Sequence, residues 1–181
     1  MKSLVAFVAV LATGAIAAPA FAQNLPVVGA PSYSASIGYT DANIGSLNFG
    51  MATFRARADF AKMFGVEGEA GVGIVDQNPM VGSLTFQTHI NDEYAAYGVV
   101  RYPVLANLSV FARGGYGHTD VKASSPALNS VTAGFDSWNY GAGAEYFVDK
   151  NGVRIDYTRM DFQDRGLRDA DTVSVSYVRK F

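Results

Sequence analysis

The sequence has 181 residues, a length that suits one domain. Its 14 basic and 16 acidic residues give a net charge of −2, and nothing in this balance favours a nucleic-acid partner. The chain has no cysteine, which excludes disulfides and thiol chemistry.

The first residues carry a signal for export. Lys2 precedes an apolar run from Leu4 to Ala18, and Ala20-Phe21-Ala22 follows as a small-x-small cleavage site. We expect a secretory signal peptide over residues 1–22 and a mature domain over residues 23–181. The mature chain is rich in Gly and Tyr and has no apolar run long enough for a membrane helix, which favours β-structure.

A first strand is expected at about residues 32–40, and the clearest pattern in the chain comes next. Between Met51 and Ile74, polar and apolar residues alternate strictly, which predicts two strands joined by a short turn at residues 61–63. This turn sets a register in which Arg57 faces Glu67 and Arg55 faces Glu69. The same register satisfies charge pairing on one face and aromatic pairing on the other.

Residue choice indicates which face of this hairpin lies inside. The charged face carries Arg rather than Lys, and Arg suits confined, bidentate pairing with carboxylates. Glycines alternate with these charges and leave room for long side chains. We therefore place the charges inside and the apolar face outside, toward lipid. The alternative is a soluble, lipocalin-like ligand-binding barrel with its charges in water and its apolar face inward.

Alternation continues through the rest of the chain. Short turns are expected near residues 61 and 104 and at Asp149-Lys150-Asn151-Gly152, where Asn-Gly is a strong hairpin signal. Longer loops alternate with these turns, and the longest is expected at residues 119–136. The fold class predicted is all-β: an eight-stranded antiparallel up-and-down transmembrane β-barrel. Its later strands are expected at about 84–102, 108–118, 137–148, 153–160 and 171–181.

Three segments resemble the small eight-stranded outer-membrane barrels: the transmembrane domain of OmpA, OmpX and the opacity-type adhesins. These segments are Phe64–Glu69, Phe111–Gly117 and the last strand with its terminal Phe181. The resemblance implies a bacterial outer-membrane location, with both termini periplasmic and the longer loops extracellular. It also implies insertion by the barrel-assembly machinery, although Arg179 stands where the family usually has an aromatic or aliphatic residue. The terminal assembly signal would comprise Val173, Val175, Tyr177 and Phe181.

An eight-stranded barrel is just wide enough for side chains to fill its interior. Six basic and five acidic residues fall on the predicted inner face, which predicts a packed ion-pair core. A narrow path for ions or small solutes is the functional alternative. The inner charged residues are Arg55, Arg57, Asp59, Glu67, Glu69, Arg101, Arg113, Glu145, Arg154, Asp156 and Lys180.

Some small outer-membrane barrels modify lipid A with His and Ser, so the two histidines require scrutiny. His89 and His118 both lie near loop ends, and neither has a carboxylate and a serine at a catalytic spacing. We expect no enzyme, no catalytic residue, no metal site and no cofactor. Aromatic residues near the strand ends are interpreted as two interfacial girdles: Phe60, Phe64 and Tyr102 at the turns, and Tyr94, Tyr116 and Trp138 at the loops.

The sequence therefore predicts a non-enzymatic outer-membrane barrel. By resemblance, its role is envelope integrity or surface interaction through extracellular loops. The expected partners are outer-membrane lipid, the barrel-assembly machinery, and host or envelope surface ligands.

Overall fold

The computed structural model describes residues 31–45, 47–75, 80–81, 84–85, 87–125, 128–163 and 169–181. The predicted signal peptide lies outside the described residues. Within the described part of the chain, no helix is long and apolar enough to cross a membrane. The strands are β1 (Ser32–Ile44), β2 (Leu47–Asp59), β3 (Phe64–Val75), β4 (Met80–Val81), β5 (Leu84–Thr85), β6 (Gln87–Pro103), β7 (Leu108–Ser125), β8 (Leu128–Val148), β9 (Asn151–Phe162) and β10 (Ala170–Lys180).

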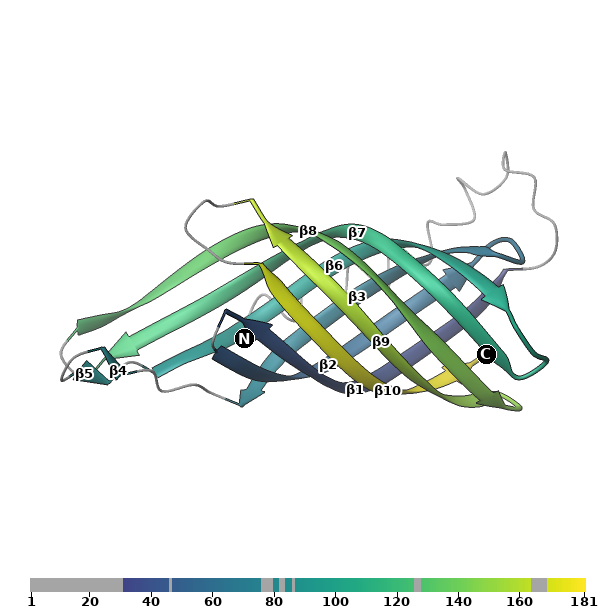
Figure 1. Cartoon of the computed structure of the whole chain (residues 1–181), viewed down its shortest axis with the longest axis horizontal. Helices are drawn as coiled ribbons and strands as arrows, with labels where there is room; N and C mark the ends of the chain where they lie inside the picture. Colours follow the sequence, from purple (N-terminus) through teal and green to yellow (C-terminus); the bar gives the residue numbers. More distant parts are fainter. Residues whose placement is uncertain are drawn as a thin grey trace.

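Eight of these strands close into an antiparallel barrel (Figure 1). The order around the barrel is β1-β10-β9-β8-β7-β6-β3-β2. Barrel strands that are consecutive in the sequence are therefore neighbours, and β1 pairs with β10 to close the barrel. The short strands β4 and β5 pair only with each other. The prediction of an eight-stranded up-and-down barrel is confirmed.

The register of the β2–β3 hairpin is the one that alternation predicts. Arg57 is the Cα partner of Glu67, and Arg55 is the partner of Glu69. The backbone N–H groups of Phe60 and Ala61 donate to the Phe64 carbonyl at 3.2 and 3.3 Å, which closes the turn. Shifting this hairpin by one residue would move every charge to the outer face.

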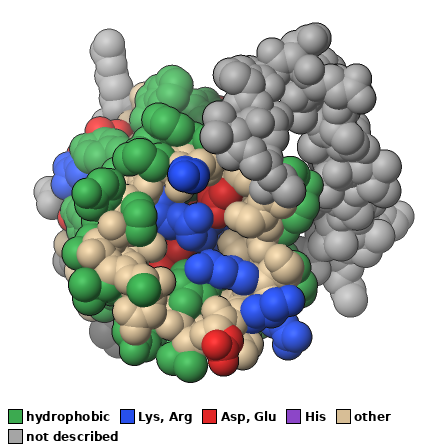
Figure 2. Space-filling view, turned by 90° about the vertical axis from the view of Figure 1, so that its right-hand side faces the viewer, with side chains coloured by type: hydrophobic (Ala, Val, Ile, Leu, Met, Phe, Trp, Pro, Cys, Tyr) green, Lys and Arg blue, Asp and Glu red, His purple; other side chains and the backbone are tan. Residues whose placement is uncertain are grey.

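Polar and apolar side chains separate cleanly between the two faces of the barrel wall. On β10, Ser174 and Ser176 are buried, whereas Val173 and Val175 are exposed by more than half. Figure 2 looks onto the end of the barrel where the C-terminus lies, and charged side chains fill the centre within an apolar rim. The lipocalin-like alternative, which needs the apolar face inside, is therefore wrong.

The prediction of a long loop at residues 119–136 is wrong. β7 and β8 continue through it as a paired hairpin, with His118 opposite Asp136 and Lys122 opposite Thr132. The ladder persists because backbone pairing needs no core beneath it, and Thr and Val suit strands there. Figure 1 shows β6, β7 and β8 extending past the other strands of the barrel at the end away from the C-terminus.

The β8–β9 turn lies within the predicted segment Asp149–Gly152, but Asp149 and Lys150 form it rather than Asn-Gly. Val148 pairs with Asn151, so Asp149 and Lys150 form the turn, and Asp149 has a φ of 55°. Gly152 faces Phe147 across the ladder, and a Cβ there would lie 2.6 Å from the Phe147 ring. This glycine makes room for an inward aromatic side chain rather than forming the turn.

Candidate functional site

The structure places nine of the eleven predicted interior charges in the barrel lumen with less than a tenth of their surface exposed. Arg101 and Lys180 are half-buried near the end that carries the short turns. The nine buried residues are Arg55, Arg57, Asp59, Glu67, Glu69, Arg113, Glu145, Arg154 and Asp156.

Two bidentate pairs cross the lumen. Arg57 on β2 donates through Nη1 and Nη2 to the Glu145 carboxylate on β8, at 2.6 and 2.9 Å. Arg154 on β9 donates to the two oxygens of Glu67 on β3, at 2.5 and 3.1 Å. The two strands in each pair lie on opposite sides of the eight-stranded barrel, four strand positions apart. The pairs therefore act as struts between opposite walls.

The predicted direct pairing of Arg57 with Glu67 is wrong, although the two residues are Cα partners. Both side chains point into the lumen, and a long guanidinium can reach past its strand neighbour to the far wall. Arg57 takes Glu145 there and keeps Asp59 beside its Nε at 3.4 Å. Arg55 does pair with Glu69, as predicted, and also donates to the Ser176 hydroxyl at 2.9 Å.

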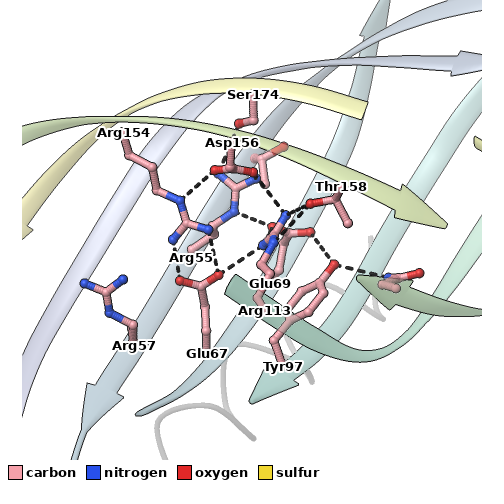
Figure 3. A network of polar contacts seen from close by, with 12 residues as sticks. Arg55, Arg57, Glu67, Glu69, Tyr97, Arg113, Arg154, Asp156, Thr158 and Ser174 are labelled. Atoms are coloured by element: carbon pink, nitrogen blue, oxygen red, sulfur yellow. Dashed lines mark hydrogen bonds and ion pairs between the residues drawn. The ribbon is translucent and has the colours of Figure 1, made fainter. Parts of the chain in front are cut away.

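Arg113 is the hub of the polar network (Figure 3). Its Nη1 lies 3.0 Å from Glu67 and 2.8 Å from Glu69, and its Nη2 lies 3.2 Å from Asp156. Nη2 also donates to the Thr158 hydroxyl at 2.7 Å. The guanidinium stacks on the Tyr97 ring at 4.2 Å. One planar cation thus satisfies three carboxylates, a geometry that a Lys ammonium does not reproduce.

The lumen is packed where the ion pairs lie. The pocket bounded by Arg55, Glu67 and Glu145 leaves no volume for a water molecule. Toward the loop end, Ala42, Phe49, Met51 and Ile90 form a buried apolar cluster. At the turn end, Arg101 contacts Asp59 at 3.1 Å and Lys180 lies 3.4 Å from the centre of the Phe147 ring.

Glu93 is a buried interior carboxyl that the sequence analysis missed. It is 3% exposed, and its Oε1 has no hydrogen-bond partner among the described residues. Its Cα partner is Gly71, so it sits diagonally from Glu69 on the same inner face. The sequence already indicated this position, because Glu93 and Arg101 lie an even number of residues apart in one strand. Their side chains therefore point to the same face. Glu93 brings the interior acids to six, equal to the predicted bases.

We expect Glu93→Gln to leave the free energy of unfolding within about 1 kcal/mol of the parent or to raise it, because it removes a poorly compensated buried charge. Glu69→Gln, the matched control on the neighbouring strand, should lower it by about 3–5 kcal/mol because Arg55 and Arg113 lose their shared carboxylate. Urea unfolding in lipid vesicles measures both. Equal losses for the two variants would show that Glu93 has a cationic partner.

His118 lies between two carboxylates at the loop end of β7. His118 and Asp120 lie on the outer face, beyond the edge-to-face Tyr116–Trp138 pair that ends the lipid-facing band, whereas Thr119 between them is buried inside. Asp136 lies 2.7 Å from His118 Nδ1 and Asp120 lies 3.4 Å from Nε2, and the Asp136 hydrogen bond raises the pKa of His118. Both ring nitrogens of His118 therefore face carboxylates, an arrangement that differs from a general base with one nitrogen open to a substrate. The backbone of His89 lies in β6 opposite Lys122.

The predicted girdle and terminal residues lie on the outer face of the barrel. Phe64 and Tyr102 are more than half exposed near the turns, and Trp138 is 60% exposed near the loops. In β10, Val173, Val175 and Tyr177 point outward. Phe181 follows β10, and its backbone N–H donates to the Tyr33 carbonyl at 3.0 Å.

Comparisons with known proteins agree with this architecture. A family model described as "Outer membrane protein beta-barrel domain" matches residues 8–181. No curated protein sequence matches the chain. The structure of Ail, the attachment invasion locus protein of Yersinia pestis, in complex with the heparin analogue sucrose octasulfate, has a TM-score of 0.64 and 19% identity. That match covers 84% of this chain and 100% of Ail.

Two further solved structures show the same fold. A major outer membrane protein from Thermus thermophilus has a TM-score of 0.59 and 12% identity, over 84% of this chain and 100% of that one. The N-terminal β-barrel domain of Pseudomonas aeruginosa OprF has a TM-score of 0.56 and 10% identity, over 80% and 96%. At these identities the likeness concerns the fold alone.

Proposed function

Because this chain belongs to the outer membrane protein β-barrel family, we propose that it is a non-enzymatic surface-interaction protein of the bacterial outer membrane. The interaction surface is the sheet formed by the outer parts of β6, β7 and β8. The short turns and both termini lie in the periplasm, and the projecting sheet lies outside the cell. Residues 1–22 direct export, and the last strand, with Val173, Val175, Tyr177 and Phe181, directs insertion by the barrel-assembly machinery.

The observation that carries this proposal is the pair of unpaired edges on the projecting sheet. β3 pairs with β6 only as far as Glu93, and β9 pairs with β8 only as far as Ser137. Beyond those residues, β6 and β8 still pair with β7 on one side, as far as Gln87 and Leu128. On their other sides, Gly73 of β3 still lies against the Ile90 backbone, and the Gln163 N–H donates to the Asp136 carbonyl at 3.0 Å. Past Ile90 and Asp136, no described strand pairs with β6 or β8 on that side. Such edges present backbone N–H and C=O groups that can accept an added strand from a partner.

The charges at this end favour a peptide partner over a sulfated polysaccharide. The Ail structure holds a heparin analogue. Here the described outward charges at the loop end are mostly acidic, and they would repel a polyanion. The acidic side chains there include Asp120, Asp136, Asp161, Asp169 and Asp171. The basic ones include Lys122, Arg159 and His118.

The packed interior supports a closed barrel rather than a channel for ions or small solutes. The apolar cluster at the loop end and the struts at the turn end each fill the lumen. A barrel of this kind contributes to the envelope through its wall and its outer surface.

Topology is tested by cysteine labelling, since the parent has no cysteine. We expect Lys122→Cys to react with a membrane-impermeant maleimide on intact cells. Lys62→Cys, at the β2–β3 turn, should react only after the outer membrane is permeabilised. The reverse pattern would invert the proposed orientation.

The interaction itself is tested by shortening the projecting hairpin. A variant in which Asn-Gly replaces residues 121–133 keeps the barrel ladder, because Asp120 and Gly134 are Cα partners. It should lose binding to a panel of host and envelope surface proteins while unfolding in urea like the parent. Undiminished binding would contradict a role for the projecting sheet.

A further inference from the structure

A groove interrupts the apolar outer wall near the β8–β9 turn. It has a volume of about 250 Å³, and its lining is almost wholly apolar. Tyr146 and Val148 of β8, Val153 of β9 and Tyr177 of β10 form most of that lining, and each is between 44% and 62% exposed. The groove is continuous with the surface that the family places against lipid.

Two basic side chains stand at the turn end of this groove. Arg179 is the Cα partner of Asn151, which lines the groove, and Arg179 is exposed on the same outer face. Lys150 occupies the turn, and its carbonyl accepts a hydrogen bond from the Lys180 backbone N–H at 2.8 Å. Among the described residues, the ion pairs of the barrel involve neither Arg179 nor Lys150.

A polar contact fixes the boundary between the apolar and basic parts. The Tyr177 hydroxyl donates to the Asn151 side-chain oxygen at 2.5 Å. The apolar lining therefore lies toward the middle of the barrel wall, and the two cations lie beyond this contact, at the level where the membrane becomes polar.

We propose that this groove binds one anionic phospholipid of the periplasmic leaflet. An acyl chain lies along Tyr146, Val153 and Tyr177, and the phosphate contacts Arg179 and Lys150. The charge complementarity selects an anionic headgroup, and the apolar lining selects a lipid over free phosphate. The site rests on the proposed topology, which places the short turns in the periplasm.

Fluorescence quenching in bilayers tests the site. Trp138→Phe removes the sole tryptophan, and Tyr146→Trp then places a reporter in the groove. This reporter protein is inserted into phosphatidylcholine bilayers that contain dibrominated phosphatidylglycerol or dibrominated phosphatidylcholine. We expect the groove to prefer phosphatidylglycerol by about fivefold or more, the effect of a basic side chain near an anionic lipid surface.

Three variants separate the contributions. Arg179→Gln with Lys150→Gln should abolish the preference, whereas Lys62→Gln, at another turn on the same end, should keep it. Val153→Phe fills the groove and retains both cations, and it too should abolish the preference. A heat-dependent shift in mobility on SDS gels confirms that each variant has formed a closed barrel.

Other results would overturn the site. Equal quenching of the reporter protein by the two lipids would show that the groove does not select a headgroup. A preference that survives Val153→Phe would show that the cations act without the groove. Weaker quenching by both lipids as protein density rises would indicate that a second copy covers it. If neither lipid quenches, the reporter is not in the bilayer, and the outer-membrane proposal fails with the site.

Discussion

Glu145→Ala should lower the free energy of unfolding by about 3–5 kcal/mol, because it leaves the Arg57 guanidinium buried without its bidentate partner. Arg57→Ala should cost a similar amount. The double variant should cost much less than the two losses together, because no orphan charge remains. Urea unfolding of all four proteins in lipid vesicles gives the coupling free energy.

A surface pair in the same protein supplies the control. Arg159 and Asp169 are 2.6 Å apart, as close as Arg57 and Glu145, but their side chains are 37% and 42% exposed. The same cycle there should give a coupling of about 0–1 kcal/mol. A second cycle on Arg57 and Glu67 should give a smaller coupling than Arg57 with Glu145. Coupling near zero for Arg57 and Glu145 would mean that water reaches the strut.

Arg113→Lys should destabilise the barrel by several kcal/mol, on the order of 3–5, although it preserves the charge. A Lys ammonium is a compact donor that cannot reach Glu67, Glu69, Asp156 and Thr158 together, whereas the guanidinium contacts all four. It also loses the stacking on Tyr97. Urea unfolding in vesicles measures the loss.

Arg113→Gln provides the comparison, because it removes the charge as well. We expect Arg113→Lys to recover less than half of the loss that Arg113→Gln causes. Arg159→Lys on the outer surface should change the unfolding free energy by less than about 0.5 kcal/mol. If Arg113→Lys had the same free energy of unfolding as the parent, the positive charge alone would account for the stability that Arg113 contributes.

Local alternation predicted the parts of the fold that depend on one strand and its neighbour. Arg55 and Arg57 fall opposite Glu69 and Glu67 because a two-strand ladder with a short turn has only one register that pairs their charges. The inward position of Tyr97 follows from Arg101 in the same way, since side chains alternate along a strand.

Contacts across the lumen could not be predicted in this way. Glu145 is 88 residues from Arg57, and its distance in space depends on barrel circumference and strand stagger, which alternation does not encode. The extension of β7 and β8 was missed for a different reason. The Ser, Ala and Thr content of residues 119–136 favours a loop, although Val121, Ala133 and Phe135 share one face of the paired hairpin. Glu93 was within reach of the same alternation, because it lies on the same strand face as Arg101.

The struts also govern the order of events during assembly. In a flat, open sheet, β2 and β8 would lie four strands apart, about 19 Å at ~4.8 Å per strand, which exceeds the combined reach of Arg57 and Glu145. Their charges therefore stay hydrated until the sheet curls and β1 meets β10. Closure dehydrates and pairs them in one event, so a half-curled barrel gains little from its interior. Assembly of this barrel should consequently end in a slow, all-or-none step dominated by contacts between distant parts of the chain.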